Sequence, residues 1–197
     1  TVIGHLRHEV GHHFFRVLVR SPDDLAAARA RFGDERSNYA ASLERRYSTP
    51  MQGPEPAFVT SYAMAHPSED WAETFAHYLH LRDGLETALA FQLSPAVDAC
   101  DAPIRELVGQ WSTVVRAVTA ISDGLGQPRP FPRPTTDPDL LAKFDLIHRL
   151  ISTYERRGGP DELAEDPQSA LAPVIRAAHQ IAGIAAHTGR NEPDVVT

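Results

Sequence analysis

The sequence has little cysteine and no long apolar run, and each shortage excludes a class of protein. A single cysteine, Cys100, forms no disulfide within the chain and excludes a zinc ribbon built from its own cysteines. It fits a reducing compartment, so we expect a cytoplasmic protein. No apolar run is long enough to span a bilayer, and no basic segment followed by an apolar one opens the chain. The sequence therefore predicts a soluble protein with no membrane partner.

Basic residues are also fewer than acidic ones. The chain has 19 Lys and Arg against 26 Asp and Glu, a formal net charge of -7, and Lys143 is its single lysine. A general nucleic-acid binder needs a basic face, so we expect no nucleic-acid partner. The 197 residues are 42% hydrophobic, which is enough for one compact domain with a core and hardly enough for two.

Histidine, in contrast, is abundant, and its placement is uneven. Ten histidines occur, and seven of them fall into two short windows: His5, His8, His12 and His13, then His66, His77 and His80. Histidine is a common metal ligand, and its unperturbed pKa lies nearest neutrality among the side chains. The clustering therefore indicates a site with metal or proton-transfer chemistry.

Apolar residues recur at spacings of three and four along most of the chain, which predicts a mainly α-helical protein. Strand signals are weak. We divide the chain into a metal-binding catalytic part (residues 1–95), a helical part packed on it (96–190) and a frayed tail (191–197). Helices are predicted over about 2–19, 22–33, 39–47, from 67 onward, 103–123, 137–157 and 171–187.

The strongest motif is His8-Glu9-Val10-Gly11-His12, an HExxH inside the first predicted helix. Residues four apart lie one helical turn above each other, so two imidazoles can reach one zinc ion at about 2.0–2.1 Å each. Glu9 can reach a water on that ion without being a ligand, which is where a general base must sit. The motif predicts Zn²⁺ as cofactor, His8 and His12 as metal ligands, and Glu9 as catalytic base.

A third protein ligand has to come from elsewhere, and Glu69-Asp70-Trp71-Ala72-Glu73 offers carboxylates on a predicted helix. We favour Glu73, because it lies inside that helix and not at its frayed end. Glu69 and Asp70 suit the first turn of a helix, where acids are stabilising. Asp70 is alternatively an acceptor for the ring N–H of a ligating histidine. His77, one turn after Glu73, is a competing third ligand.

Three blocks of the sequence carry a resemblance: HEVGHHFF (8–15), FGDERSNYAASL (32–43) and SYAMAHPSEDWAETFAHYLH (61–80). They resemble bacterial zinc-binding metallopeptidases of the gluzincin type, and a looser likeness runs on to residues 143–151. The resemblance implies a zincin-like fold with His8 and His12 as ligands, Glu9 as base and Glu73 as third ligand.

Within the third block, Tyr62 and His66 lie just ahead of the ligand helix and are candidate catalytic residues. A phenol or an imidazole there would stabilise the oxyanion of a tetrahedral intermediate. The plainer alternatives are a packed aromatic for Tyr62 and a loop residue for His66. Asp34 is expected in a charged turn, with a contact to a ligand histidine as the alternative.

Similar proteins carry a zinc-ribbon-like segment and a sheet ahead of the HExxH helix, and neither is present here. We therefore expect the chain to be the helical part of a larger peptidase. If the absent part includes the edge strand that pairs with substrate, this part would bind metal and cleave nothing.

The sequence favours a zinc-dependent metalloendopeptidase that acts on a peptide or an unfolded protein. The alternative is a non-catalytic, metal-stabilised interaction or regulatory module that retains a zincin scaffold. A fourth zinc position that is open beside a groove would favour the enzyme, and a fourth protein ligand would favour the module.

Overall fold

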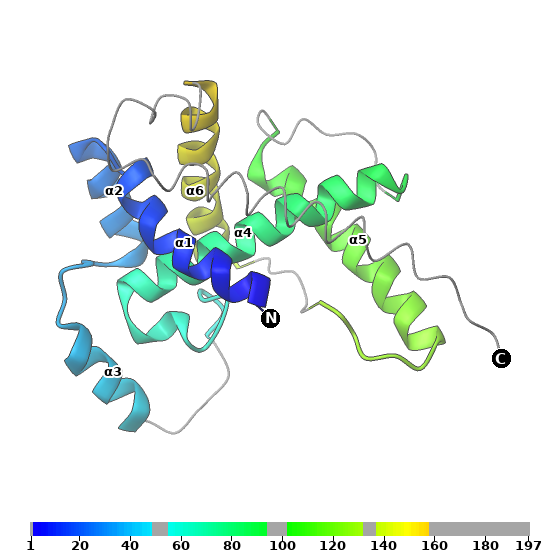
Figure 1. The fold of residues 1–197 in the computed structure, drawn as a ribbon, viewed down its shortest axis with the longest axis horizontal. Helices are drawn as coiled ribbons and strands as arrows, with labels where there is room; N and C mark the ends of the chain where they lie inside the picture. Colours follow the sequence, from blue (N-terminus) through cyan, green and yellow to red (C-terminus); the bar gives the residue numbers. More distant parts are fainter. Residues whose placement is uncertain (1, 49–54, 94–101, 132–136, 158–197) are drawn as a thin grey trace. The chain divides into compact units, whose positions relative to one another are not determined.

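The structure, a computed structural model, describes residues 2–48, 55–93, 102–131 and 137–157 (Figure 1). Within these residues the chain forms α-helices, one 3-10 turn and no strand, which confirms the predicted mainly helical class. One compact unit covers Thr1–Thr153, and a second begins at Tyr154. The predicted helix over 171–187 and the tail 191–197 lie outside the described residues, and the predicted division at residue 95 stays a prediction.

The helices begin and end close to the predicted positions. In chain order they are α1 (Val2–Leu18), α2 (Pro22–Phe32), α3 (Tyr39–Ser48), the 3-10 turn η1 (Ala63–Ala65), α4 (Pro67–Ala90), α5 (Ile104–Gly124) and α6 (Pro138–Arg156). Ser21 caps α2, since its side chain accepts the backbone N–H of Asp24 at 3.0 Å. Gly33 follows α2 with φ at 94°, a left-handed conformation that favours glycine.

Helix α4 lies at the centre of the first unit, where α1, α2, η1 and α5 all contact it. Its side chains are buried around most of its circumference, and Trp71, Phe75 and Tyr78 are almost fully enclosed. The large aromatic side chains of such a helix are stable only where other elements cover them. The burial of α4 therefore fixes its position, and with it the position of the acids in its first two turns.

Helices α1 and α4 approach each other closely at Gly11 and Ala72. A Cβ added to Gly11 would lie 3.1 Å from Cα of Ala72, closer than side chains normally pack. The carbonyl of Gly11 accepts a hydrogen bond from Nε1 of Trp71 at 2.9 Å, which holds the two helices together at this point. The absence of a side chain at residue 11 thus permits the contact that the site requires.

Helix α6 reaches α4 through the single lysine of the chain. Nζ of Lys143 donates to Oδ2 of Asp70 at 2.6 Å and to the carbonyl of Ala57 at 2.8 Å, and it lies 4.0 Å from the ring centroid of Phe58. Both charged groups are buried. Burial raises the pKa of Asp70 to about 6, although the bond from Lys143 opposes that shift. Asp70 therefore pairs with α6, and its described contacts include no ligand histidine.

None of the helices in the described part of the chain has the length and the apolar composition that a bilayer crossing requires.

Candidate metal centre

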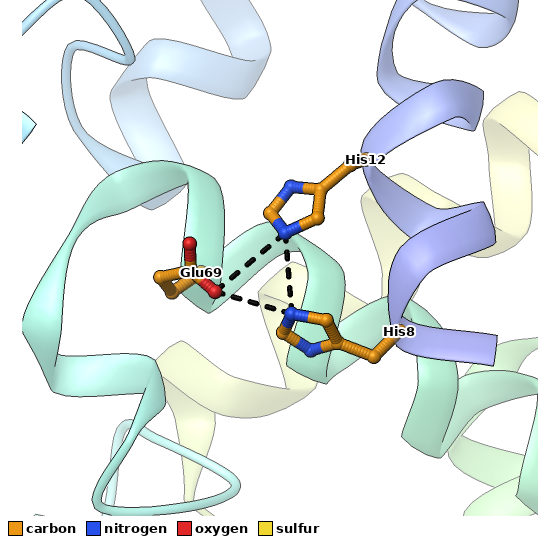
Figure 2. A group of neighbouring side chains, drawn as sticks. All are labelled: His8, His12 and Glu69. Carbon is orange, nitrogen blue, oxygen red and sulfur yellow. Dashed lines mark hydrogen bonds and ion pairs between the residues drawn. The ribbon is translucent and has the colours of Figure 1, made fainter. Parts of the chain in front are cut away.

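Three side chains from α1 and α4 converge on one point (Figure 2). Nε2 of His8 and Nε2 of His12 lie 3.2 Å apart. Oε2 of Glu69 lies 3.1 Å from Nε2 of His8 and 3.6 Å from Nε2 of His12. The histidines come from successive turns of α1, and the acid comes from the first turn of α4, so the close approach of the two helices assembles the group.

The spacing of these three atoms fits a zinc ion. Ligand atoms at about 2.0–2.1 Å from a tetrahedral zinc are separated from one another by about 3.3 Å, close to the three distances observed. Oε2 of Glu69 is also buried and has no hydrogen-bond partner among the described residues. A buried polar atom without a partner calls for an explanation, and a cation bound between the imidazoles supplies one. Two imidazoles and one carboxylate form a common ligand set of catalytic zinc.

Glu73 lies beside this group and not in it. Oε1 of Glu73 lies 2.7 Å from Nδ1 of His8, the ring nitrogen on the side away from Glu69. Oε2 of Glu73 accepts the hydroxyl of Thr60 at 2.7 Å, and the same hydroxyl oxygen accepts the backbone N–H of Ala63. With Nδ1–H of His8 donating to Glu73, Nε2 is left with a free lone pair for a metal. The structure thus places Glu73 behind the ring of His8, on the nitrogen that points away from the candidate metal point.

The first turn of α4 is held in place, which removes the reason for preferring Glu73 over Glu69. His66 is the N-cap of α4, and its Nδ1 accepts the backbone N–H of Ser68 at 3.1 Å. Nε2 of His66 donates to the carbonyl of Ser37 at 3.0 Å, which ties the turn to the segment ahead of α3. Glu69 is therefore on an anchored turn and not at a frayed end. Both ring nitrogens of His66 serve this anchor, which differs from the predicted oxyanion contact.

The electrostatics of the group favour a positive charge at its centre. The close approach of the Glu69 carboxylate, and then the bond to Glu73, raise the pKa of His8 to about 9. Burial works to raise the pKa of Glu69, but the nearby imidazoles of His12 and His8 and the hydrogen bond from Tyr39 outweigh it and hold that pKa well below its usual range. For Glu73, burial is likewise outweighed, by His8 and Thr60, and its pKa is lowered. Two carboxylates that stay ionised beside imidazoles suit a divalent cation.

Two tyrosines adjoin the group. The ring of Tyr62 lies 5.9 Å from the ring of His8, and 39% of this residue is exposed. Burial, a hydrogen bond with Tyr39 and the charge of Glu69 raise the pKa of Tyr62, so its phenol keeps its proton. Tyr39 donates its hydroxyl to Oε1 of Glu69 at 3.0 Å. The predicted oxyanion donor, Tyr62, therefore lies beside the candidate ligands in its protonated form.

Glu9, the predicted base, lies on the solvent side of α1. Its side chain is 58% exposed, and Oε1 lies 3.7 Å from Nε2 of His5. A general base must exchange protons with water and substrate, so exposure next to His8 is compatible with that role.

The remaining acids and histidines of the prediction have other partners. Nδ1 of His77 lies 2.8 Å from the carbonyl of Glu73, so this ring nitrogen bonds to the preceding turn of its own helix. Asp34 makes two bonds to the guanidinium of Arg36, in the charged turn that the sequence predicts. The described contacts of His77 and Asp34 thus include no member of the metal group.

Comparison with known proteins identifies the family to which the chain belongs. The family model described as "Putative zinc-binding metallo-peptidase" matches residues 1–150, about three quarters of the chain. The chain belongs to this family. The resemblance given by the three sequence blocks is thereby confirmed.

Relatives in this family include uncharacterized proteins of Mycobacterium bovis and of two strains of Mycobacterium tuberculosis. Each is 36% identical to this chain over 176 residues, an alignment that covers 84% of the chain and 48% of the relative. The chain thus spans about half the length of these relatives. No solved structure matches the chain.

Sequence reasoning considered Glu69 and set it aside in favour of Glu73, and it did not identify Tyr39 or Thr60 as neighbours of the candidate site. The spacing of Glu69 and Glu73 carried a signal, because acids four apart share a helix face, as His8 and His12 do. One acid of such a pair can bind the metal while the other accepts a hydrogen bond from a ligating residue. Tyr39 and Thr60 carried no comparable signal, since their positions depend on how the segments before α3 and η1 fold.

Proposed function

We propose that this protein is a zinc-dependent peptidase whose zinc is held by His8, His12 and Glu69. The observation that carries the proposal is Oε2 of Glu69, a buried oxygen without a hydrogen-bond partner in the described residues that faces two imidazole nitrogens. Membership in a family of zinc-binding metallopeptidases supports it.

Zinc bound there would supply Lewis acidity toward a water molecule and a peptide carbonyl. Glu9 is the group that moves the proton: its carboxylate takes a proton from the attacking water and delivers it to the nitrogen of the leaving amine. Tyr62, whose raised pKa keeps the phenol protonated, donates a hydrogen bond to the carbonyl oxygen as negative charge develops. Glu73 and Thr60 hold His8 in the orientation that presents Nε2.

The substrate class we propose is a peptide or an unfolded protein, and the proposed setting is the cytoplasm. The relatives extend well beyond the aligned region, so the activity of the whole protein belongs to the same proposal.

Replacement of Glu9 tests the mechanism. Glu9→Gln removes the proton acceptor and leaves the three proposed ligands intact. We expect the variant to keep one zinc per chain and to hydrolyse denatured casein at least about 100-fold more slowly than the wild type, because general-base catalysis contributes that much. Zinc content by atomic emission and cleavage by release of soluble peptides measure the two quantities. Glu86→Gln, the same change at an exposed position of α4, is the matched control.

The outcomes separate enzyme from binding module. Cleavage by Glu9→Gln at the wild-type rate would contradict the mechanism. A wild type that binds zinc and cleaves no substrate would instead support the non-catalytic module.

A further inference from the structure

We infer that Tyr39 is a positioning residue that keeps Glu69 bound to the metal through one oxygen. The inference rests on the proposed zinc site and deepens it, since it names what holds the third ligand. Neither the HExxH motif nor the acids of α4 indicate this tyrosine.

The two oxygens of Glu69 have different surroundings. Oε1 accepts the hydroxyl of Tyr39 at 3.0 Å. Oε2 is buried, has no hydrogen-bond partner among the described residues, and faces the two ligand histidines. A carboxylate has two equivalent oxygens, and either or both can bind a cation. The phenol therefore distinguishes them, by occupying one and leaving the other for the metal.

The phenol is itself held in a fixed place relative to Glu69. The ring of Tyr39 packs edge-on against the ring of His66, with 5.1 Å between centroids. His66 caps the helix that carries Glu69, and it also binds Ser37, two residues before Tyr39. Donor and acceptor are thus linked through one buried residue, so the bond costs little additional ordering.

The chemical consequence is an open coordination position. Without the phenol, Oε1 would be free to turn toward the cation and take the place that catalytic zinc reserves for water or substrate. A carboxylate held by its other oxygen keeps zinc at three protein ligands. Tyr39 acts through Glu69 and needs no contact with substrate.

The test is Tyr39→Phe, which removes the hydroxyl and retains the ring against His66. Because partners of ligating residues typically contribute that much, we expect the zinc affinity of the full chain to fall about 10- to 100-fold, measured by competition with a chromophoric chelator. After substitution with Co²⁺, we expect a weaker visible absorption band than in the wild type, since a second oxygen from Glu69 raises the coordination number.

Tyr78→Phe is the matched control. It removes a tyrosine hydroxyl from α4 that bonds Nδ1 of His148 at 2.9 Å, among buried residues outside the metal group. We expect this variant to lose stability while it keeps the wild-type zinc affinity and cobalt spectrum. Melting temperatures of the metal-free proteins show how much each hydroxyl contributes to folding alone.

Two results would overturn the role of Tyr39. One is a Tyr39→Phe variant with wild-type affinity and spectrum, and the other is an equal loss of affinity in Tyr39→Phe and Tyr78→Phe. Failure of the zinc site itself looks different: Glu69→Gln would then bind zinc as tightly as the wild type, whatever happens at Tyr39.

Discussion

Several side chains in the candidate site use their two polar atoms for different partners. His8 points Nδ1 at Glu73 and Nε2 at the centre, and Glu73 in turn uses its second oxygen to accept from Thr60. Glu69 gives one oxygen to Tyr39 and the other to the centre. His8 and Glu69, two of the three proposed ligands, are therefore each oriented by a partner behind them, which keeps their ligand atoms in place before a metal binds.

This division of tasks predicts unequal effects at the two acids of α4. Glu69→Gln removes a charged ligand, so we expect zinc affinity to fall by more than about 100-fold. Glu73→Gln keeps an oxygen that can accept a hydrogen bond from Nδ1 of His8. We therefore expect its zinc affinity to fall by no more than about 10- to 100-fold. Competition titration with a chelator measures both. The opposite order would return Glu73 to the role of third ligand, as the sequence alone suggests.

Among the helices, close approaches at glycine set the geometry. Gly11 lets α1 contact α4 at Ala72, and the proposed ligands lie around that contact: His8 and His12 are on either side of Gly11, and Glu69 precedes Ala72 by one turn. Gly84 likewise permits a close contact between α4 and α5, because the indole of Trp111 packs where a side chain of residue 84 would lie. A side chain at either glycine would push its two helices apart, and at Gly11 these are the helices that carry the proposed ligands.

Two glycine substitutions should therefore change the free energy of unfolding in opposite directions. A Cβ at Gly84 would lie 2.4 Å from the Trp111 ring, so Gly84→Ala should lower the free energy of unfolding by about 1–3 kcal/mol. Gly109, inside α5, has nothing within 4 Å of that position, so Gly109→Ala should raise it by about 0.5–1 kcal/mol through helix propensity. Urea unfolding of the two variants checks both values, and a stabilised Gly84→Ala would contradict the packing described.

For the molecule as a whole, the site joins segments far apart in the sequence. α1 supplies two of the proposed ligands and α4 the third, while α6 holds α4 through the buried pair of Lys143 and Asp70. Such a pair adds little net stability, but loss of one partner leaves an uncompensated buried charge. A metal that bridges α1 and α4 binds the folded chain and stabilises it by mass action.

Removal of metal should consequently lower the melting temperature. With free zinc at about 100 times its Kd, the folded state gains about 2.7 kcal/mol, which corresponds to a shift of about 5–10 °C for a unit of this size. We expect a chelator to abolish that shift in the wild type and in Glu86→Gln, and to change Glu69→Gln hardly at all. Differential scanning calorimetry measures it, and an equal response in all three proteins would contradict a bridging metal at Glu69.

Much of this picture was predictable because its signals are local. Helix periodicity, the cap at Ser21 and the stop at Gly33 depend on neighbouring residues, and the observed helices follow them. The spacing of His8 and His12 is equally local, since four residues make one turn. The choice between Glu69 and Glu73 is not a local matter, because it depends on whether the first turn of α4 is frayed. His66 and Ser37, which precede the helix, hold that turn in place.

The sequence by itself determined the helical class, the family and the motif that carries both imidazoles. The tertiary structure decided which carboxylate faces them, which one stands behind His8, and that Asp70 pairs with Lys143 instead of a histidine. The physical reason is range: periodicity and capping act over one or two turns, whereas ligand assignment depends on contacts between helices that only a folded core brings together.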